Sequence, residues 1–319
     1  MIPVKLKKLK DQFEDHNIDG YVIPKNDEFF SEFSNKDRLN FITGFSGSAG
    51  LAVILKNKNY LFVDGRYTLQ AKIQSGKKFK IIDFSKIINV DLFQNLTLGV
   101  DPKLFTSFQI KNFFLKKNKI KLIEENLIDN IFKSRFRVSK PFYYLDKNVT
   151  GESHLKKIDR VTKYLNRNKL NHIFITAPEN VAWLLNIRGH DNPTSPIPNS
   201  YLILSNKKDI FLITDKEKSI KLIKQKRFKK LQIIELNKIS TFLKTFKSNR
   251  ILIDEKTCNI HLEDILNKRF EIIKKEDPIY LMKSIKNKIE INNMINAHII
   301  DGVALTKFIY WLKKLNKKR

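Results

Sequence analysis

The chain has 319 residues, a formal net charge of +28 and an apolar content of 42% that includes 24 phenylalanines. This length is enough for about two domains of ordinary size, each with its own core. No apolar run approaches the roughly 20 residues of a membrane span, and the basic start lacks the apolar stretch of a signal peptide. Because Cys258 is the single cysteine, an internal disulfide framework is excluded. We therefore expect a cytoplasmic protein that does not contact membranes.

The high positive charge raises the question of a nucleic-acid partner. Only 11 of the 61 basic residues are arginine, which is the residue best suited to bidentate contacts with phosphate and guanine. Lysine, asparagine, isoleucine and phenylalanine are abundant together, as an AT-rich coding sequence would produce. We expect a solvated lysine-rich surface, with no specific nucleic-acid partner and only weak, salt-sensitive binding to duplex DNA.

The first half of the chain begins with an expected helix over residues 5–17, because Leu6, Leu9 and Phe13 share one face. An expected strand over Gly20–Pro24 ends at its proline. Further elements are expected in this order: a helix at 37–42, a hairpin at 50–55 and 60–63, a helix at 68–74, strands at 80–84 and 98–101, a helix at 106–117 and a strand at 120–123.

A glycine-rich stretch, TGFSGSAG, lies just before the hairpin. No Lys-Ser or Lys-Thr follows it, and a strand comes next where a phosphate-binding loop would start a helix. The stretch is therefore interpreted as a loop shaped for close backbone packing. The hairpin ends in Asp64, Gly65 and Arg66. An aspartate between a strand and a helix is an ordinary N-cap worth about 1 kcal/mol, so this triplet is predicted to be a structural motif.

The second half repeats the order of the first, with strands expected at 172–178, 201–204, 210–215, 231–236 and 251–254. The offset is 152 residues from Tyr21 to Ile173 and 151 from Asp64 to Asp215. Offsets this steady indicate a duplicated α/β domain, in which each copy is a mixed sheet flanked by helices. The expected boundaries are 1–140 for the first copy, 141–276 for the second, and 277–319 for a helical segment that starts after the cap Asp277.

The sharpest candidate for a functional site is the segment NIRGHDNP, which contains Arg188 and Asp191 and is followed by Pro196 and Pro198. Its prolines hold an extended loop and prevent pairing as a central strand. Two interpretations of Arg188 stay open. It braces the loop by pairing with Asp191 or Asp215, or it faces a substrate.

The six histidines provide no metal-binding pattern, since neither H-x-x-x-H nor H-E-x-x-H occurs. The acidic cluster that starts at His261 is expected to be a solvated helix surface. Ser46 and Ser48 follow no strand, so they form no nucleophile elbow. We predict no catalytic residue and no metal ligand in this chain.

The motifs TGFSGSAG and FVDGRYTLQA resemble the amino-terminal domain of aminopeptidase P, the Xaa-Pro aminopeptidases of the creatinase/prolidase superfamily. The loop NIRGHDNP resembles a second-domain loop of that family that borders the active-site cleft. The resemblance implies that Arg188 and Asp191 are cleft candidates, and that Asp64, Gly65 and Arg66 are a structural hallmark and not metal ligands.

Residues 283–290 and 297–304 resemble the first helices of the family's catalytic pita-bread domain. In the family that domain holds two divalent ions, usually manganese, which activate a water for attack on the bond before a penultimate proline. None of its ligand positions has a counterpart here, so the pita-bread domain is expected to be incomplete. The resemblance then covers about half of a full family member.

The resemblance implies the amino-terminal portion of an Xaa-Pro aminopeptidase that supplies dimerisation and walls the cleft. Its implied partners are a homodimeric copy, peptides with a penultimate proline and the missing catalytic domain. We expect no bound cofactor and no activity of this chain alone. A truncated reading frame, half of a split gene and a natural non-catalytic module stay open. The alternative function is a non-catalytic binding module of the same superfamily, like its histone chaperones, although a charge of +28 does not suit a cationic partner.

An aromatic face at Phe308, Trp311 and Leu312 ends the chain. Such a face is an association liability when it is left in water. We expect this helix either to fold back on the second domain or to drive self-association.

Overall fold

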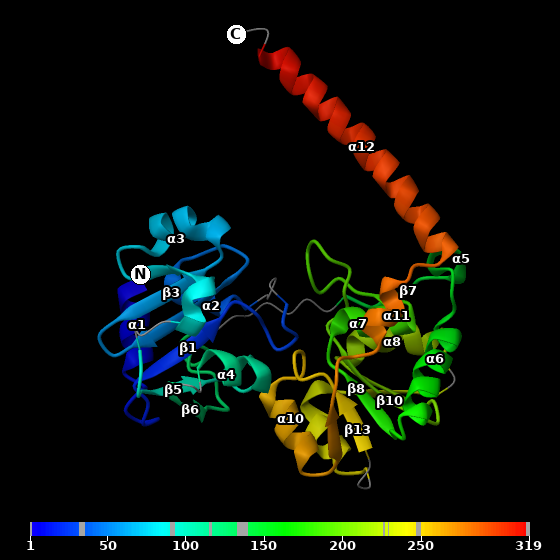
Figure 1. Ribbon diagram of the computed structural model, residues 1–319, viewed down its shortest axis with the longest axis horizontal. Coiled ribbons are helices and arrows are strands. Elements are labelled where there is room, and N and C mark those ends of the chain that lie inside the picture. Colours follow the sequence, from blue (N-terminus) through cyan, green and yellow to red (C-terminus); the bar gives the residue numbers. More distant parts are fainter. Residues whose placement is uncertain are drawn as a thin grey trace.

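The computed structural model describes residues 2–31, 36–89, 93–114, 117–132, 140–225, 227–228, 230–246 and 250–316. Two six-stranded mixed sheets are each flanked by helices, and one long helix projects away from the second (Figure 1). We call residues 2–132 the first unit and residues 140–284 the second unit. The expected domain boundaries themselves stay predictions.

The sheet of the first unit has the order β4-β3-β2-β1-β5-β6. β1 is antiparallel to β2 on one side and parallel to β5 on the other, so the sheet is mixed and the type of pairing changes at this central strand. Its strands are β1 (Gly20–Pro24), β2 (Gly50–Leu55), β3 (Asn59–Val63), β4 (Lys80–Asp83), β5 (Thr97–Val100) and β6 (Lys119–Leu122). Its helices are α1 (Ile2–Lys10), α2 (Arg38–Thr43), η1 (Gly65–Tyr67), α3 (Thr68–Ser75), η2 (Phe84–Asn89) and α4 (Ser107–Phe113).

Alternation along β1 divides the apolar residues of the first unit between two layers. Tyr21 and Ile23 pack in a cluster with Leu9 of α1, whereas Val22 packs with Phe105 on the other face. All five residues of β1 are buried, as expected for a strand that helices cover on both faces. The predicted helix at 5–17 ends at Lys10, and turns follow it.

The sheet of the second unit has the same order, β12-β11-β10-β8-β13-β14. Its strands are β8 (His172–Ile175), β10 (Tyr201–Ser205), β11 (Ile210–Ile213), β12 (Leu231–Ile234), β13 (Arg250–Ile253) and β14 (Glu271–Lys274). A small sheet joins β7 (Tyr143–Tyr144) to β9 (Ile187–Arg188). The helices are α5 (Lys147–Thr150), α6 (His154–Arg167), α7 (Pro178–Leu185), α8 (Lys216–Lys224), η3 (Leu236–Lys238), α9 (Ile239–Leu243), α10 (Ile260–Asn267) and α11 (Ile279–Ser284).

The matching strand orders confirm the duplication predicted from the offsets. Asp64 and Asp215 are both N-caps of the helix that follows the third strand, in chain order, of their six-stranded sheet. The glycine-rich loop is closely packed as predicted, because a Cβ at Gly47 would lie 2.2 Å from the Phe45 ring. The sequence did not indicate β14 or the small sheet of β7 and β9.

The two units meet at equivalent positions of their folds. Thr106 and Asn259, the N-caps of α4 and α10, form an antiparallel bridge. The amide of Ile260 donates to the carbonyl of Phe105 at 2.9 Å, and the Ile260 side chain belongs to a core cluster of the first unit. Phe29 of the first unit packs in return on a core cluster of the second. Each unit therefore covers part of the other's core.

The chain ends in α12 (Lys288–Asn316), a single helix of 29 residues that extends away from both units (Figure 1). Phe308 is 52% exposed and Trp311 is 54% exposed. The expectation that this helix folds back on the second unit is wrong, and self-association stays a prediction. Among the described residues, no helix is both long enough and apolar enough to cross a membrane.

Candidate functional site

The loop after β9 is closed by its own hydrogen bonds. The amide of Gly189 donates to the carbonyl of Pro196 at 3.0 Å, and the amide of Asn199 donates to the Asp191 carboxylate at 2.8 Å. Both bonds join the start of the loop to its end. The prolines of the loop have no N–H to donate, so they form no such bonds themselves. The sequence predicted the extended loop, but Arg188 itself pairs in β9 with Tyr143 of β7.

Asp191 is buried and forms an ion pair with Lys218 of α8. Lys218 also lies 3.6 Å from the carboxylate of Asp215. The expected brace between Arg188 and one of these aspartates is therefore wrong, because Lys218 takes that place. A lysine one turn into a helix gives no sequence signal for this role, since its partner is 27 residues away.

The Arg188 guanidinium donates through Nη1 to the carbonyls of Ala182 and Ile187, at 3.2 and 2.8 Å. Across the described ranges, no carboxylate lies within ion-pair distance of it. Burial lowers the pKa of Arg188, opposed by the charges of Tyr143 and Glu290. A substrate-facing role for Arg188 stays a prediction.

The triplet Asp64, Gly65 and Arg66 forms the local cap that the sequence predicted. The Asp64 carboxylate accepts from the amide of Arg66 at 2.9 Å and from its Nε at 2.8 Å. The hydrogen bonds from Arg66 hold the pKa of Asp64 below its usual value. Asp64 also lines a hollow of about 320 Å³ with Lys25 and Phe84, so its surroundings are open to solvent.

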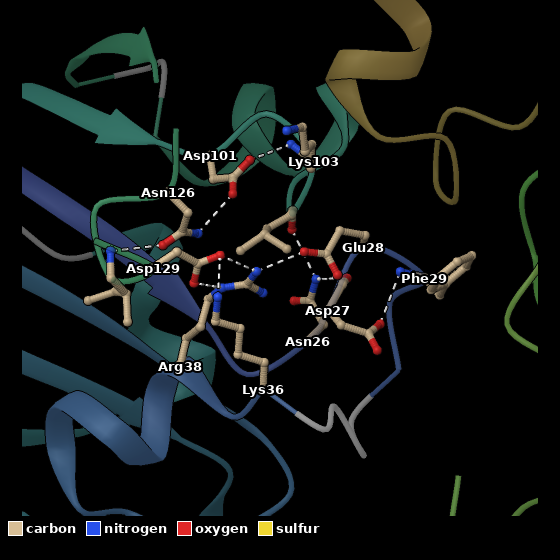
Figure 2. A network of polar contacts seen from close by, with 12 residues as sticks. Asn26, Asp27, Glu28, Phe29, Lys36, Arg38, Asp101, Lys103, Asn126 and Asp129 are labelled. Atoms are coloured by element: carbon tan, nitrogen blue, oxygen red, sulfur yellow. Dashed lines mark hydrogen bonds and ion pairs between the residues drawn. The ribbon is translucent and has the colours of Figure 1, made fainter. Parts of the chain in front are cut away.

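A polar network in the first unit was not anticipated from the sequence (Figure 2). Arg38, at the start of α2, donates to Asp129 at 2.8 and 3.0 Å and to Glu28 at 2.8 Å. Lys36 pairs with Asp129 at 2.8 Å. Burial opposes ionisation of Asp129, but Arg38 and Lys36 outweigh it and lower the pKa of that carboxyl. The network holds the segment at residues 27–31 that carries Phe29 to the second unit.

The segment at residues 27–31 forms a turn around the carboxylate of Asp27. Asp27 accepts from the amides of Phe29 and Ser31 at 3.0 and 2.9 Å. Burial raises the pKa of Asp27 to about 6. The Phe29 ring packs against the Tyr201 ring at a tilt of 32°, with ring centroids 4.8 Å apart, and the Tyr201 hydroxyl donates to the carbonyl of Glu28.

A hollow of about 400 Å³ lies where this segment faces the loop after β9. Ser31 of the first unit donates through Oγ to Oδ1 of Asn192 at 3.0 Å, which ties its two sides together. Its lining residues come from both units and are Phe29, Phe30, Ser31, Pro178, Glu179, Asn192, Ser195, Ile197 and Asn199. Neither Arg188 nor Asp191 lines it. Asp191 contributes by holding the loop that forms one wall.

The hollow is lined by hydrogen-bonding side chains as well as apolar ones. Glu179 supplies a carboxylate that accepts from the Tyr280 hydroxyl at 2.9 Å, and Asn199 has a buried Oδ1 with no hydrogen-bond partner. The Glu179 carboxylate is thus an acceptor on the lining of the hollow, whereas the Asn199 oxygen is covered by protein. In the described part of the chain, no three His, Cys, Asp or Glu side chains are placed to hold a metal ion. The described residues therefore do not fit the dinuclear centre that the resemblance implies for the family.

The cluster that starts at His261 is not a solvated surface, which corrects the sequence interpretation. Glu263 is buried and accepts from Ser107 of the first unit at 2.7 Å. His261 lies 3.1 Å from the Glu124 carboxylate across the same contact. The sequence of α10 does not show this contact, because its partners Ser107 and Glu124 belong to the other unit.

Comparison with known proteins agrees with this architecture. Two family models described as the creatinase/prolidase N-terminal domain match residues 5–119 and 134–290. The two α/β units share one topology and contact each other at the N-caps of α4 and α10. They are thus a tandem of such domains. The chain belongs to the creatinase/prolidase N-terminal domain family.

The chain is similar along nearly its whole length to Xaa-Pro aminopeptidases. It is 29% identical to a probable Xaa-Pro aminopeptidase P of Laccaria bicolor over 97% of this chain and 51% of that protein. It is 30% identical to Xaa-Pro aminopeptidase ApepP of Drosophila melanogaster over 94% of this chain and 52% of the relative. The chain therefore spans about half the length of the curated relatives it matches, and corresponds to their amino-terminal portion.

A crystal structure of X-prolyl aminopeptidase from Caenorhabditis elegans matches with a TM-score of 0.86 and 26% identity. The match covers 98% of this chain and 56% of that protein, which is described as a cytosolic enzyme with a dinuclear active site. The agreement includes both units together, so their mutual placement follows a known arrangement.

Proposed function

We propose that this chain acts as the amino-terminal portion of an Xaa-Pro aminopeptidase and forms one wall of its substrate cleft. The observation that carries the proposal is α12, whose apolar side chains are exposed around the helix, Phe308 and Trp311 included. Apolar surface of this extent is normally covered by protein. The relatives have about as much chain again beyond the matched part, and that part would cover α12.

The proposed substrates are peptides with proline as their second residue, as the relatives' names suggest. The hollow at Glu179 and Asn192 would contact the peptide, while the reaction would occur on residues outside this chain. A pair of divalent ions, usually manganese in the family, would belong to that catalytic portion. We also propose a cytosolic location and a homodimer. The alternative of a non-catalytic binding module gains no separate support.

The test is a cleavage assay on the purified chain with added manganese and a short peptide whose second residue is proline. We expect no release of the first residue, because no described group of this chain is placed to hold the metal ions. A chimera of residues 1–316 with the carboxyl-terminal half of a matched relative should cleave the peptide. The relative's half alone serves as control.

Two results would contradict this proposal. One is turnover by the chain alone that a chelator abolishes. The other is a folded chimera no more active than the relative's half alone. In the chimera, Asn192→Ala should raise KM with little change in kcat, because Asn192 would bind the peptide without touching the reacting bond.

A further inference from the structure

The outer edge of the second sheet differs from the other sheet edges of this protein. The two six-stranded sheets end in β4, β6, β12 and β14. Three of these strands carry charged residues, with the sequences KIID, KIKL and EIIK, whereas β12 reads LQII and has no charge. Charged residues on an edge strand prevent pairing with another chain. β12 lacks this protection.

The main chain of β12 has hydrogen-bonding groups that face outward. The carbonyl of Ile234 accepts from the amide of Thr214 at 3.0 Å, which directs Ile234 toward β11. Main-chain groups of successive strand residues face opposite sides, so the N–H and C=O of Ile233 face away from the sheet. An added strand would satisfy both groups.

A groove of about 570 Å³ runs along this edge, between α8 and α9. Its apolar lining comes from Ile223 of α8, Phe242 beside β12, and the strand residues Ile233 and Ile234. Ile223 is 47% exposed. No strand of the described part of the chain pairs with the outer side of β12. The groove thus combines this strand edge with apolar positions for alternate side chains, which is what strand addition requires.

The positive charge around the groove favours an acidic partner. Lys216 and Lys238 line it, and exposed lysines at 221, 224 and 244 lie on the helices beside it. Glu235 is the acidic lining residue, and it pairs with Lys238 at 2.9 Å. A second copy of this chain would bring two lysine-rimmed grooves together, and like charges repel. An acidic segment would be attracted.

We propose that β12 is a docking site for an extended peptide segment of a partner protein, with alternating apolar and acidic side chains, that adds to the sheet as a further strand. Main-chain hydrogen bonds to Ile233 hold the segment. Its apolar side chains contact Ile223 and Phe242, and its carboxylates face Lys216 and Lys238. This role is independent of peptide cleavage.

The test measures binding of a fluorescein-labelled peptide of about six residues, the length of an ordinary strand, in which valine alternates with glutamate. Fluorescence anisotropy with the full chain reports binding. Ile233→Pro removes the outward N–H and also shortens a side chain that lines the groove, and proline is tolerated at such edge positions. We expect at least tenfold weaker binding for this variant, and the same loss when alternate amides of the peptide are N-methylated. The N-methylated peptide tests the main-chain bonds alone.

Matched variants separate the groove from the helix that flanks it. Ile223→Ser should weaken binding several-fold. Ile220→Ser, at a similarly exposed residue of α8 that does not line the groove, should have no effect. A peptide with lysine in place of glutamate should not bind. Hydrogen exchange on the wild-type chain should show slower exchange of the Ile233 amide when the peptide is added, which keeps the test valid if Ile233→Pro does not fold.

Several results would overturn the proposal. One is the absence of binding at the highest soluble protein concentration. Another is equal affinity for the lysine peptide. A third is that the added peptide slows hydrogen exchange elsewhere but not at the Ile233 amide. Self-association of the chain that Ile233→Pro abolishes would instead identify a second copy as the occupant, and would also refute it.

Discussion

The two units place aspartates at matching positions but balance their charge differently. At the end of β5, Asp101 accepts from Nδ2 of Asn126 at 2.8 Å. At the end of β13, Asp254 accepts from the amide of Asp277 at 3.1 Å. Asn126 and Asp277 then each accept, through Oδ1, a main-chain N–H two residues ahead, both at 2.9 Å. The backbone role is the same in both units, because it requires only an acceptor oxygen.

The first unit has Asn126 where the second has Asp277, and this difference changes the local charge. In the second unit Asp277 is a buried carboxyl beside another aspartate, and burial raises its pKa to about 6. Asn180 donates to it at 2.8 Å, but Oδ1 of Asn180 is buried without a partner. Glu179 and Tyr280 pair nearby, and the charge of Lys283 lowers the pKa of Asp277 only in part.

The first unit has a cation at the corresponding place. Arg38 precedes the left-handed C-cap Gly44 by six residues, as Asn180 precedes the left-handed C-cap Asn186. Arg38 neutralises two carboxylates, Glu28 and Asp129 (Figure 2). At these matching positions the two units therefore share backbone geometry but differ in charge. The first unit has an arginine paired with two carboxylates, whereas the second has the buried carboxyl of Asp277 with a neutral asparagine beside it.

The largest expected effect comes from removing the cation. Arg38→Met should destabilise the first unit by about 3 kcal/mol, because it removes the ion pair of Glu28 and leaves Asp129 with the charge of Lys36 alone beside it. Asn180→Ala at the corresponding place should cost about 1.5 kcal/mol at pH 7, the lower end of the range for a hydrogen bond to a charged group, because the change also removes the unpaired Oδ1 of Asn180. Urea unfolding followed by hydrogen exchange in each unit measures both. Equal losses in the two variants would contradict the comparison.

The sequence predicted most strands because they are buried apolar runs bounded by turn residues, and their repeat revealed the duplication. It missed β14, a short strand of four residues that begins and ends with a charge and has no equivalent among the predicted strands of the second half. It also missed the Arg38 network, since Asp129 lies 91 residues away and no local pattern joins them. The interpretation of Arg188 as a brace to Asp191 or Asp215 was wrong for the same reason, because the fold brings Lys218 close to both aspartates.

The second effect is a reciprocal exchange of the equivalent residues. The pKa of Asp277 is about 6 in the fold and 3.8 in its usual state. A carboxyl whose pKa is raised contributes stability below pH 4, and this contribution is lost as pH rises through 6. Asp277→Asn should therefore stabilise the second unit by about 2 kcal/mol at pH 7 and have little effect at pH 4.

Asn126→Asp is the matched variant in the first unit. It should lower stability at pH 7 and add a pH dependence of the same sign, because it places a carboxyl beside buried Asp101. Thermal unfolding between pH 4 and pH 8 measures both. A stability difference for Asp277→Asn that does not vary across this range would show that the carboxyl is not strained.

The smallest effect tests whether the two networks are independent. The Tyr201 hydroxyl of the second unit donates to the carbonyl of Glu28, whose carboxylate binds Arg38. Tyr201→Phe should cost about 1 kcal/mol, the loss of one hydrogen bond. Combined with Arg38→Met it should show a coupling of at least 0.5 kcal/mol, because both changes release the segment that carries Phe29. Combined with Asn180→Ala it should be additive, since these residues share no partner among the described contacts. Additivity in both double variants would mean that the charge network of the first unit does not extend across the contact with the second.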